Sequence, residues 1–156
     1  MQGLDDLNHP AADKYDDPAV EAQWVVDQRK RVNAYLEKEG CTHAGVAQEP
    51  DWFIAPYLAI WRIASVKAPG ATGWWAISGD CPTDYLSSKG ILNSRDAMRA
   101  FSRQWREVAE CMLKGISHPT IHIGSPEDWP ELGDLLKRRA KILAGWAEDN
   151  EIWAVE

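Results

Sequence analysis

Apolar residues recur at intervals of three and four in three long stretches of the chain, a spacing typical of amphipathic helices. We expect helices over residues 18–40 and 94–114 and from residue 128 onward. Asp17 followed by proline favours the first helix start, and Gly40 is a typical helix end. The positions expected to be buried are Trp24, Val25, Val32, Tyr35, Leu36, Met98, Phe101, Trp105, Val108, Met112, Leu132, Leu135, Leu136, Leu143 and Trp146.

Between the first two helices the pattern changes to alternation, with aromatic and β-branched residues. It predicts strands over about 57–66 and 74–78, joined by a Pro- and Gly-containing turn into a hairpin. A two-stranded hairpin is marginally stable alone, so we expect residues 120–123, 152–155 or both to extend it. The predicted fold class is α+β: a small antiparallel sheet built on this hairpin and packed by three long helices, in the order roughly α-β-β-α-β-α.

The charge is concentrated at the two ends of the chain. Of the net charge of −7, residues 1–17 carry −4 and residues 148–156 carry another −4, which leaves the body near neutral. We expect residues 1–17 to be a mobile acidic arm and residues 18–156 to be a single globular domain. A nearly neutral body lacks the basic stripe of a nucleic-acid-binding protein, so no nucleic-acid partner is expected.

Composition also bears on location and on metal binding. The longest uncharged apolar run, residues 52–61, is much shorter than the ~20 residues of a membrane span, and the N-terminus lacks the order of a signal peptide. We therefore expect a soluble, cytoplasmic protein without a membrane partner. The three cysteines, Cys41, Cys81 and Cys111, are isolated from one another, which argues against a zinc site or a disulfide framework.

The stretch Gly73–Tyr85, GWWAISGDCPTDY, has the densest chemistry in the chain. Asp80 and Asp84 follow a predicted strand end, where carboxylates often bind ligands or catalyse. The structural alternative is that Asp80 forms a turn, while Thr83 and Asp84 begin a short helical turn that Gly90 closes.

The aromatic residues of the same stretch complete the candidate site. Trp74 and Trp75 are adjacent in a strand and therefore point to opposite faces. An exposed tryptophan here would serve as an interface anchor or a ligand platform. The candidate binding residues are Trp74, Trp75, Asp80, Asp84 and Tyr85.

Other candidate groups do not form a recognised catalytic arrangement. If the segment is extended, as Pro119 and the β-branched Thr120 and Ile121 suggest, the Cα atoms of His118 and His122 would lie about 13 Å apart, too far to share a metal ion easily. There is no nucleophile elbow, phosphate-binding loop or dinucleotide fingerprint, and Asp80 would raise rather than lower the thiol pKa of Cys81. We predict no catalytic residue, no metal and no cofactor.

The second helix carries a row of arginines: Arg95, Arg99, Arg103 and Arg106. Such a row suits phosphate or an acidic partner. The simpler interpretation is a solvated face, because Glu107 and Glu110 lie four residues beyond Arg103 and Arg106 and are placed to pair with them.

The phrase G-W-W-x-I-x-G-D-x-P-T-D-Y, followed by NSRDAMRAFSRQW, resembles a family of small bacterial proteins described only as a domain of unknown function. The resemblance covers most of residues 50–115. It implies a bacterial, soluble, single-domain protein and brings no activity or catalytic residue.

The expected function is a non-enzymatic, cytosolic protein-binding module of the inhibitor (immunity) or adaptor type. A small, acidic chain with nine tryptophans and no catalytic constellation fits this class. The alternative is a small enzyme or ligand-binding domain that uses Asp80, Asp84 and Tyr85 beside Trp74 or Trp75. A protein partner is expected in the first case, and the oligomeric state is open.

Overall fold

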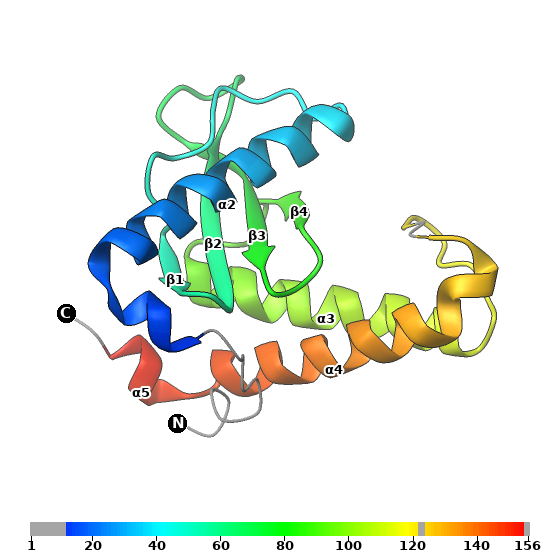
Figure 1. The fold of residues 1–156 in the computed structure, drawn as a ribbon. Helices are drawn as coiled ribbons and strands as arrows, with labels where there is room; N and C mark the ends of the chain where they lie inside the picture. The colour runs from blue at the N-terminus through cyan, green and yellow to red at the C-terminus, as the bar shows by residue number, and fades with distance from the viewer. Residues whose placement is uncertain (1–11, 122–123, 155–156) are drawn as a thin grey trace. The chain divides into compact units, whose positions relative to one another are not determined.

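The computed structural model describes residues 12–121 and 124–154 (Figure 1). The chain forms two compact units, one containing the described residues up to Ala97 and the other those from Met98 onward. The fold class is α+β, as predicted, with three long helices. In chain order the elements are η1 (Ala12–Asp16), α2 (Pro18–Lys38), β1 (Trp52–Ile54), β2 (Leu58–Ala64), β3 (Thr72–Gly79), β4 (Asp84–Ser87), α3 (Ser94–Leu113), η2 (Pro126–Asp128), α4 (Trp129–Ala147) and α5 (Asn150–Trp153).

The first unit is an antiparallel sheet with strand order β1-β2-β3-β4, crossed on one face by α2 (Figure 1). The predicted hairpin is confirmed as β2 and β3, with Trp61 opposite Ala76 and Ile63 opposite Trp74. Alternation places Trp61 and Ala76 on the face toward α2, where both are fully buried.

The strands that extend the hairpin differ from those expected. β1 and β4 flank it, whereas Ile152 and Trp153 lie in the short helix α5, which Asp149 caps by accepting a hydrogen bond from the Glu151 amide at 3.0 Å. Residues 120 and 121 are not in a strand, and residues 122, 123 and 155 lie outside the described residues. A strand next in sequence pairs with less loop-closure entropy than a distant one, which favours β1 and β4.

Helix α2 begins and ends as its sequence predicts. The Asp17 side chain accepts a hydrogen bond from the Ala19 amide at 2.9 Å, and Pro18 occupies the first turn. Gly40 follows with a φ of 72°, a conformation that glycine adopts without steric cost. The core that α2 shares with the sheet consists of Trp24, Val25, Val32, Leu36, Val46, Ala59, Trp61, Ile63 and Ala76.

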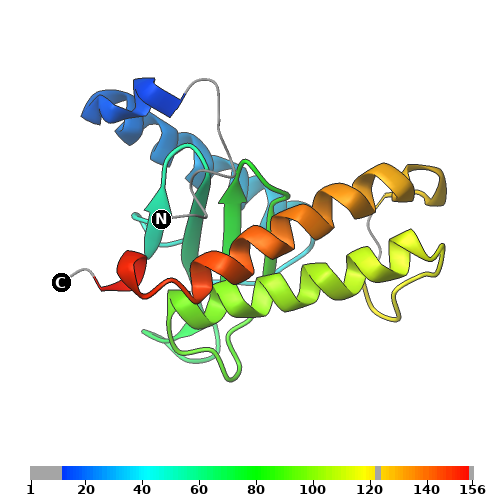
Figure 2. The same cartoon turned by 90° about the horizontal axis from the view of Figure 1, so that it is seen from below.

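The second unit is built on α3 and α4, which lie side by side (Figures 1 and 2). A side chain at Gly133 would come within 3.0 Å of Met112 Cβ, so this glycine permits a close approach of the two helices. The buried Ser102 hydroxyl donates a hydrogen bond to the Ala140 carbonyl at 2.8 Å. The expected apolar stripe of α3 is buried at Met98, Phe101, Trp105, Val108 and Met112.

Candidate functional site

The two adjacent tryptophans of β3 have different environments. Trp75 is fully buried, with the Arg62 guanidinium 4.5 Å above its ring, and its indole N–H donates a hydrogen bond to the Ile91 carbonyl at 3.4 Å. Trp74 lies on the opposite face, half-buried against the α2 core. Trp75 therefore cannot offer its ring to a ligand in this conformation, whereas part of Trp74 is accessible.

The end of β3 is set by close backbone packing. Gly79 has a φ of 131°, and a Cβ at this position would collide with the Tyr57 carbonyl. The amide of Asp80 donates to the same carbonyl at 2.9 Å. The turn that follows the strand thus requires glycine at position 79 and is held by a backbone hydrogen bond. It leaves Asp80 half-buried.

Asp84 and Tyr85 begin β4 and meet Tyr35 of α2. The Tyr35 and Tyr85 rings pack edge to face with their centres 6.0 Å apart. One Asp84 oxygen accepts a hydrogen bond from the Tyr85 amide at 2.8 Å and a longer one from the Tyr35 hydroxyl at 3.5 Å. The short helical turn that Thr83 and Gly90 indicated does not form, because residues 84–87 pair with the free edge of β3.

The electrostatics of this cluster favour protonated groups. Burial raises the pKa of Tyr35 well above its ordinary value, and the nearby charge of Asp84 raises it further. Burial also raises the pKa of Tyr85 and of the Cys41 thiol. At neutral pH the phenols and the thiol therefore keep their protons, which suits packing and hydrogen-bond donation more than nucleophilic or base chemistry.

The described residues contain neither a metal-binding cluster nor a membrane-spanning helix. No group of three or more His, Cys, Asp or Glu side chains in this part of the chain is arranged to hold a metal ion. None of the helices within residues 12–121 and 124–154 has the length and apolar composition needed to cross a membrane.

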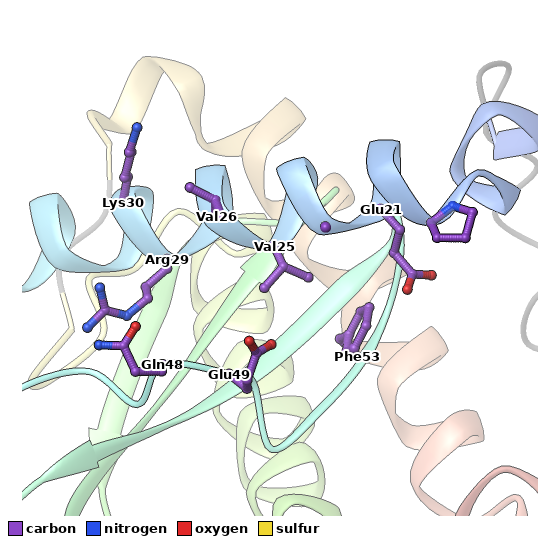
Figure 3. A pocket seen from close by; sticks show the side chains of 10 residues that line it. Glu21, Val25, Val26, Arg29, Lys30, Gln48, Glu49 and Phe53 are labelled. Carbon is purple, nitrogen blue, oxygen red and sulfur yellow. The ribbon is translucent and has the colours of Figure 1, made fainter.

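A groove of about 420 Å³ lies between α2 and the segment that leads into β1 (Figure 3). One wall of this α2 groove is fixed by Arg29, whose guanidinium donates hydrogen bonds to the carbonyls of Val46 at 2.8 Å and Ala47 at 3.0 Å. Because the guanidinium fork holds two successive carbonyls, it joins the loop to the helix across 17 and 18 residues of sequence.

The α2 groove has an apolar floor. Val25 projects from α2 toward Glu49 and Phe53 (Figure 3). Phe53 is half-buried and stacks on Trp24, with ring centres 6.1 Å apart and planes 27° apart. Val26, also on the lining, leaves 46% of its surface exposed.

Charged side chains line the groove around this floor. Glu21 lies toward the Phe53 end and Lys30 at the opposite end, with Glu49 between them (Figure 3). Among the described residues, none of these three makes an ion pair or a side-chain hydrogen bond. Since Arg29 is engaged by the loop, the rim charges with no partner in the described part of the chain are two carboxylates and one ammonium.

In a second hollow, of about 410 Å³, the guanidinium group in the lining is already hydrogen-bonded within the protein. It is lined by residues 44–48 and 70–72 together with Arg62. The Arg62 guanidinium donates to Asp51 at 2.8 Å and to the Thr72 hydroxyl at 3.1 Å, and it also covers Trp75. This hollow therefore offers a ligand fewer unsatisfied groups than the α2 groove.

The residues of the α2 groove were not among the sequence-predicted candidates. Of the predicted residues, Asp84 and Tyr85 meet in one cluster, Trp74 faces the same core as Tyr85, and Trp75 lies on the other face. The sequence feature that could have indicated the groove is Val26. It is an apolar residue on the otherwise polar face of an amphipathic helix, next to the buried stripe.

Comparison with known proteins agrees with the resemblance carried by the Gly73–Tyr85 stretch. No curated protein and no solved structure matches the chain. Residues 18–153, from the first residue of α2 to the last of α5, match a family described as a domain of unknown function (DUF4826). The chain therefore belongs to the DUF4826 family.

Proposed function

We propose that this protein is a protein-binding module of the inhibitor or adaptor type, and that the α2 groove receives a basic segment of its partner. The observation that carries the proposal is the apolar floor, Val25 and Phe53, beside charges that have no partner in the described part of the chain. An apolar centre with a polar rim is the usual composition of a protein interface.

The charges of the rim indicate the chemistry of the partner. Two carboxylates, Glu21 and Glu49, outnumber the single ammonium of Lys30. The net charge of the whole chain, −7, has the same sign and would steer a basic partner toward the protein. The partner segment is therefore an apolar residue flanked by lysine or arginine, with the basic side chains toward Glu21 and Glu49.

An enzyme or small-ligand site in the 80–85 loop has weaker support. Of its proposed groups, Tyr85 keeps its proton at neutral pH because burial raises its pKa. One Asp84 oxygen already accepts hydrogen bonds from the Tyr85 amide and the Tyr35 hydroxyl. Trp75, one of the two proposed aromatic walls, is fully buried.

The test is selection of peptides from a random displayed library on the full-length protein, followed by fluorescence anisotropy on the enriched peptides. We expect enrichment of peptides in which an apolar residue is flanked by basic residues. Val26→Asp should weaken their binding by at least about 10-fold, because it replaces an apolar contact of the lining with a hydrated carboxylate. Glu49→Lys should have an effect of similar size, because it sets an ammonium against the basic residues of the peptide.

The matched control is Val66→Asp, because Val66 is exposed to a similar extent, 51%, and lies in the β2–β3 turn away from the groove lining. This variant should bind the peptides as the unaltered protein does. Equal weakening by Val26→Asp and Val66→Asp, or a library that yields no peptide dependent on Glu49, would overturn the proposal.

A further inference from the structure

A smaller hollow, separate from the two described above, lies within the helical unit, between α3 and the C-terminal end of α4. It has a volume of about 200 Å³ and is lined on the α3 side by Arg99, Arg103 and Arg106. The small side chains of Ala144 and Ala147 line the α4 side. Arginines at intervals of three and four project from one side of a helix, so their guanidinium groups are neighbours.

The three arginines are not equally engaged. Arg99 Nε pairs with Glu148 Oε1 at 2.6 Å, so these two charges satisfy each other. Arg103 and Arg106 are exposed, and within residues 12–121 and 124–154 neither has an ion-pair or hydrogen-bond partner. The pairs expected with Glu107 and Glu110 do not form, although both glutamates lie on the same helix.

The composition of this hollow specifies the charge of a ligand. Its three arginines and single glutamate leave a net charge of +2, located on Arg103 and Arg106. A guanidinium is planar and weakly hydrated, and it binds the oxygens of phosphate through two parallel hydrogen bonds. The methyl groups of Ala144 and Ala147 leave room for an oxyanion to approach both guanidinium groups.

We infer that Arg103 and Arg106 form a binding site for a phosphate dianion, with Arg99 and Glu148 as a neutral pair at its edge. This site shares no lining residue with the α2 groove, and the inference does not depend on the proposed function. The phosphate can belong to a free small molecule or to a phosphorylated side chain, since both present the same dianionic group.

The experiment follows the arginine Nε–Hε signals of the full-length, ¹⁵N-labelled protein by NMR during titration with inorganic phosphate. The pH is held well above about 6, where a phosphate monoester is a dianion. Saturable shifts are expected at Arg103 and Arg106. The double variant Arg103→Gln/Arg106→Gln should lose at least about 10-fold in affinity, because it removes both charge-assisted contacts.

Arg138→Gln is the matched control, because Arg138 is a surface arginine of α4 that pairs with Asp134 at 3.2 Å and does not line this hollow. It should leave the phosphate affinity unchanged. If a phosphoserine peptide binds more tightly than inorganic phosphate, the phosphate belongs to a phosphorylated protein. If the two bind equally, it belongs to a free small molecule. The inference is overturned by an equal response to sodium chloride at matched ionic strength, or by full affinity in the double variant.

Discussion

Two regions of the sheet-containing unit contrast in how their chemical groups are used. The segment 79–85 concentrates carboxylates, a thiol and a phenol, and Asp84 and Tyr85 pack and hydrogen-bond with Tyr35. The α2 groove is built from common residues, yet Glu21 and Lys30 have no partner in the described part of the chain. A dense sequence motif can thus serve the fold, while an ordinary helix face keeps groups available for binding.

This contrast has measurable consequences. Changes within the 79–85 segment should lower the stability of the fold, whereas changes on the rim of the α2 groove should affect binding and leave stability nearly unchanged. The following predictions run from the largest expected effect to the smallest.

Gly79→Ala should have the largest effect, a loss of about 3 kcal/mol or more in the free energy of unfolding. The new Cβ would collide with the Tyr57 carbonyl, and a φ of 131° is strained for any side chain. Gly90→Ala is the control, because its φ is 77° but no atom lies within 4 Å of the added Cβ, so it should cost only about 1 kcal/mol. Urea denaturation measures both, and equal losses would contradict the packing argument.

Arg29→Met should lower the free energy of unfolding by about 2 kcal/mol, because two carbonyls lose a charged donor. These are the carbonyls of Val46 and Ala47, which directly precede the groove-lining residues Gln48 and Glu49. The neighbouring change Lys30→Met removes a charge that has no partner among the described residues and should stay within about 0.5 kcal/mol. If chemical denaturation gave the two variants the same stability, the hydrogen bonds of Arg29 to the loop would not stabilise the fold.

Asp84→Asn should cost about 1 kcal/mol, since a neutral amide oxygen replaces the ionised acceptor of the Tyr85 amide. It should also lower the pKa of Tyr35 and of Tyr85, because the charge that opposes phenol ionisation is removed. The phenolate absorbance followed against pH tests this directly. Unchanged phenol titration would show that Asp84 lies too far from the phenols to act on them.

The raised phenol pKa values also predict a dependence of stability on pH. An unfolded tyrosine ionises near pH 10.0, while Tyr35 in the folded chain keeps its proton to higher pH. The folded state then binds more protons than the unfolded state, so the free energy of unfolding falls as the pH rises above about 10. Tyr35→Phe should make this fall shallower in denaturation measured between neutral and alkaline pH. If the free energy of unfolding of Tyr35→Phe fell with pH as steeply as that of the unaltered protein, Tyr35 would not be the source of this pH dependence.

Val26→Asp should have the smallest effect on stability, within about 0.5 kcal/mol, because the side chain is 46% exposed on the surface of α2. Its thermal unfolding should match that of Val66→Asp. The comparison between the two regions would fail if Val26→Asp destabilised the protein as strongly as Gly79→Ala, since the groove would then be part of the core.

Much of the fold could be predicted because its signals are local. The cap at Asp17 and the terminator at Gly40 mark the ends of α2 within a few residues of the backbone groups they satisfy. The alternation in residues 57–78 predicts the β2–β3 hairpin, since adjacent strands need only a short turn. The opposite orientations of Trp74 and Trp75 follow from the same two-residue period.

Strand β4 shows where local signals fail. Thr83 and Gly90 are typical of a helical turn, yet the backbone of residues 84–87 pairs with β3 instead. An open strand edge presents a row of unpaired amides and carbonyls, and satisfying it outweighs a weak capping preference. The preference for a helical turn can be read from residues 83–90 alone. The strand β3 that competes with it is formed by residues outside this segment.

The sequence by itself determined the fold class, the helix limits, the central hairpin and the membership in a family of unknown function. Only the tertiary structure decided which functional groups are engaged and which are available. Arg29 has its acceptors 17 and 18 residues away, whereas Arg103 has no partner among the described residues despite Glu107 one helical turn along. The physical reason is that pairing depends on which atoms the whole fold brings within hydrogen-bonding distance, and neighbours in sequence set only part of that geometry.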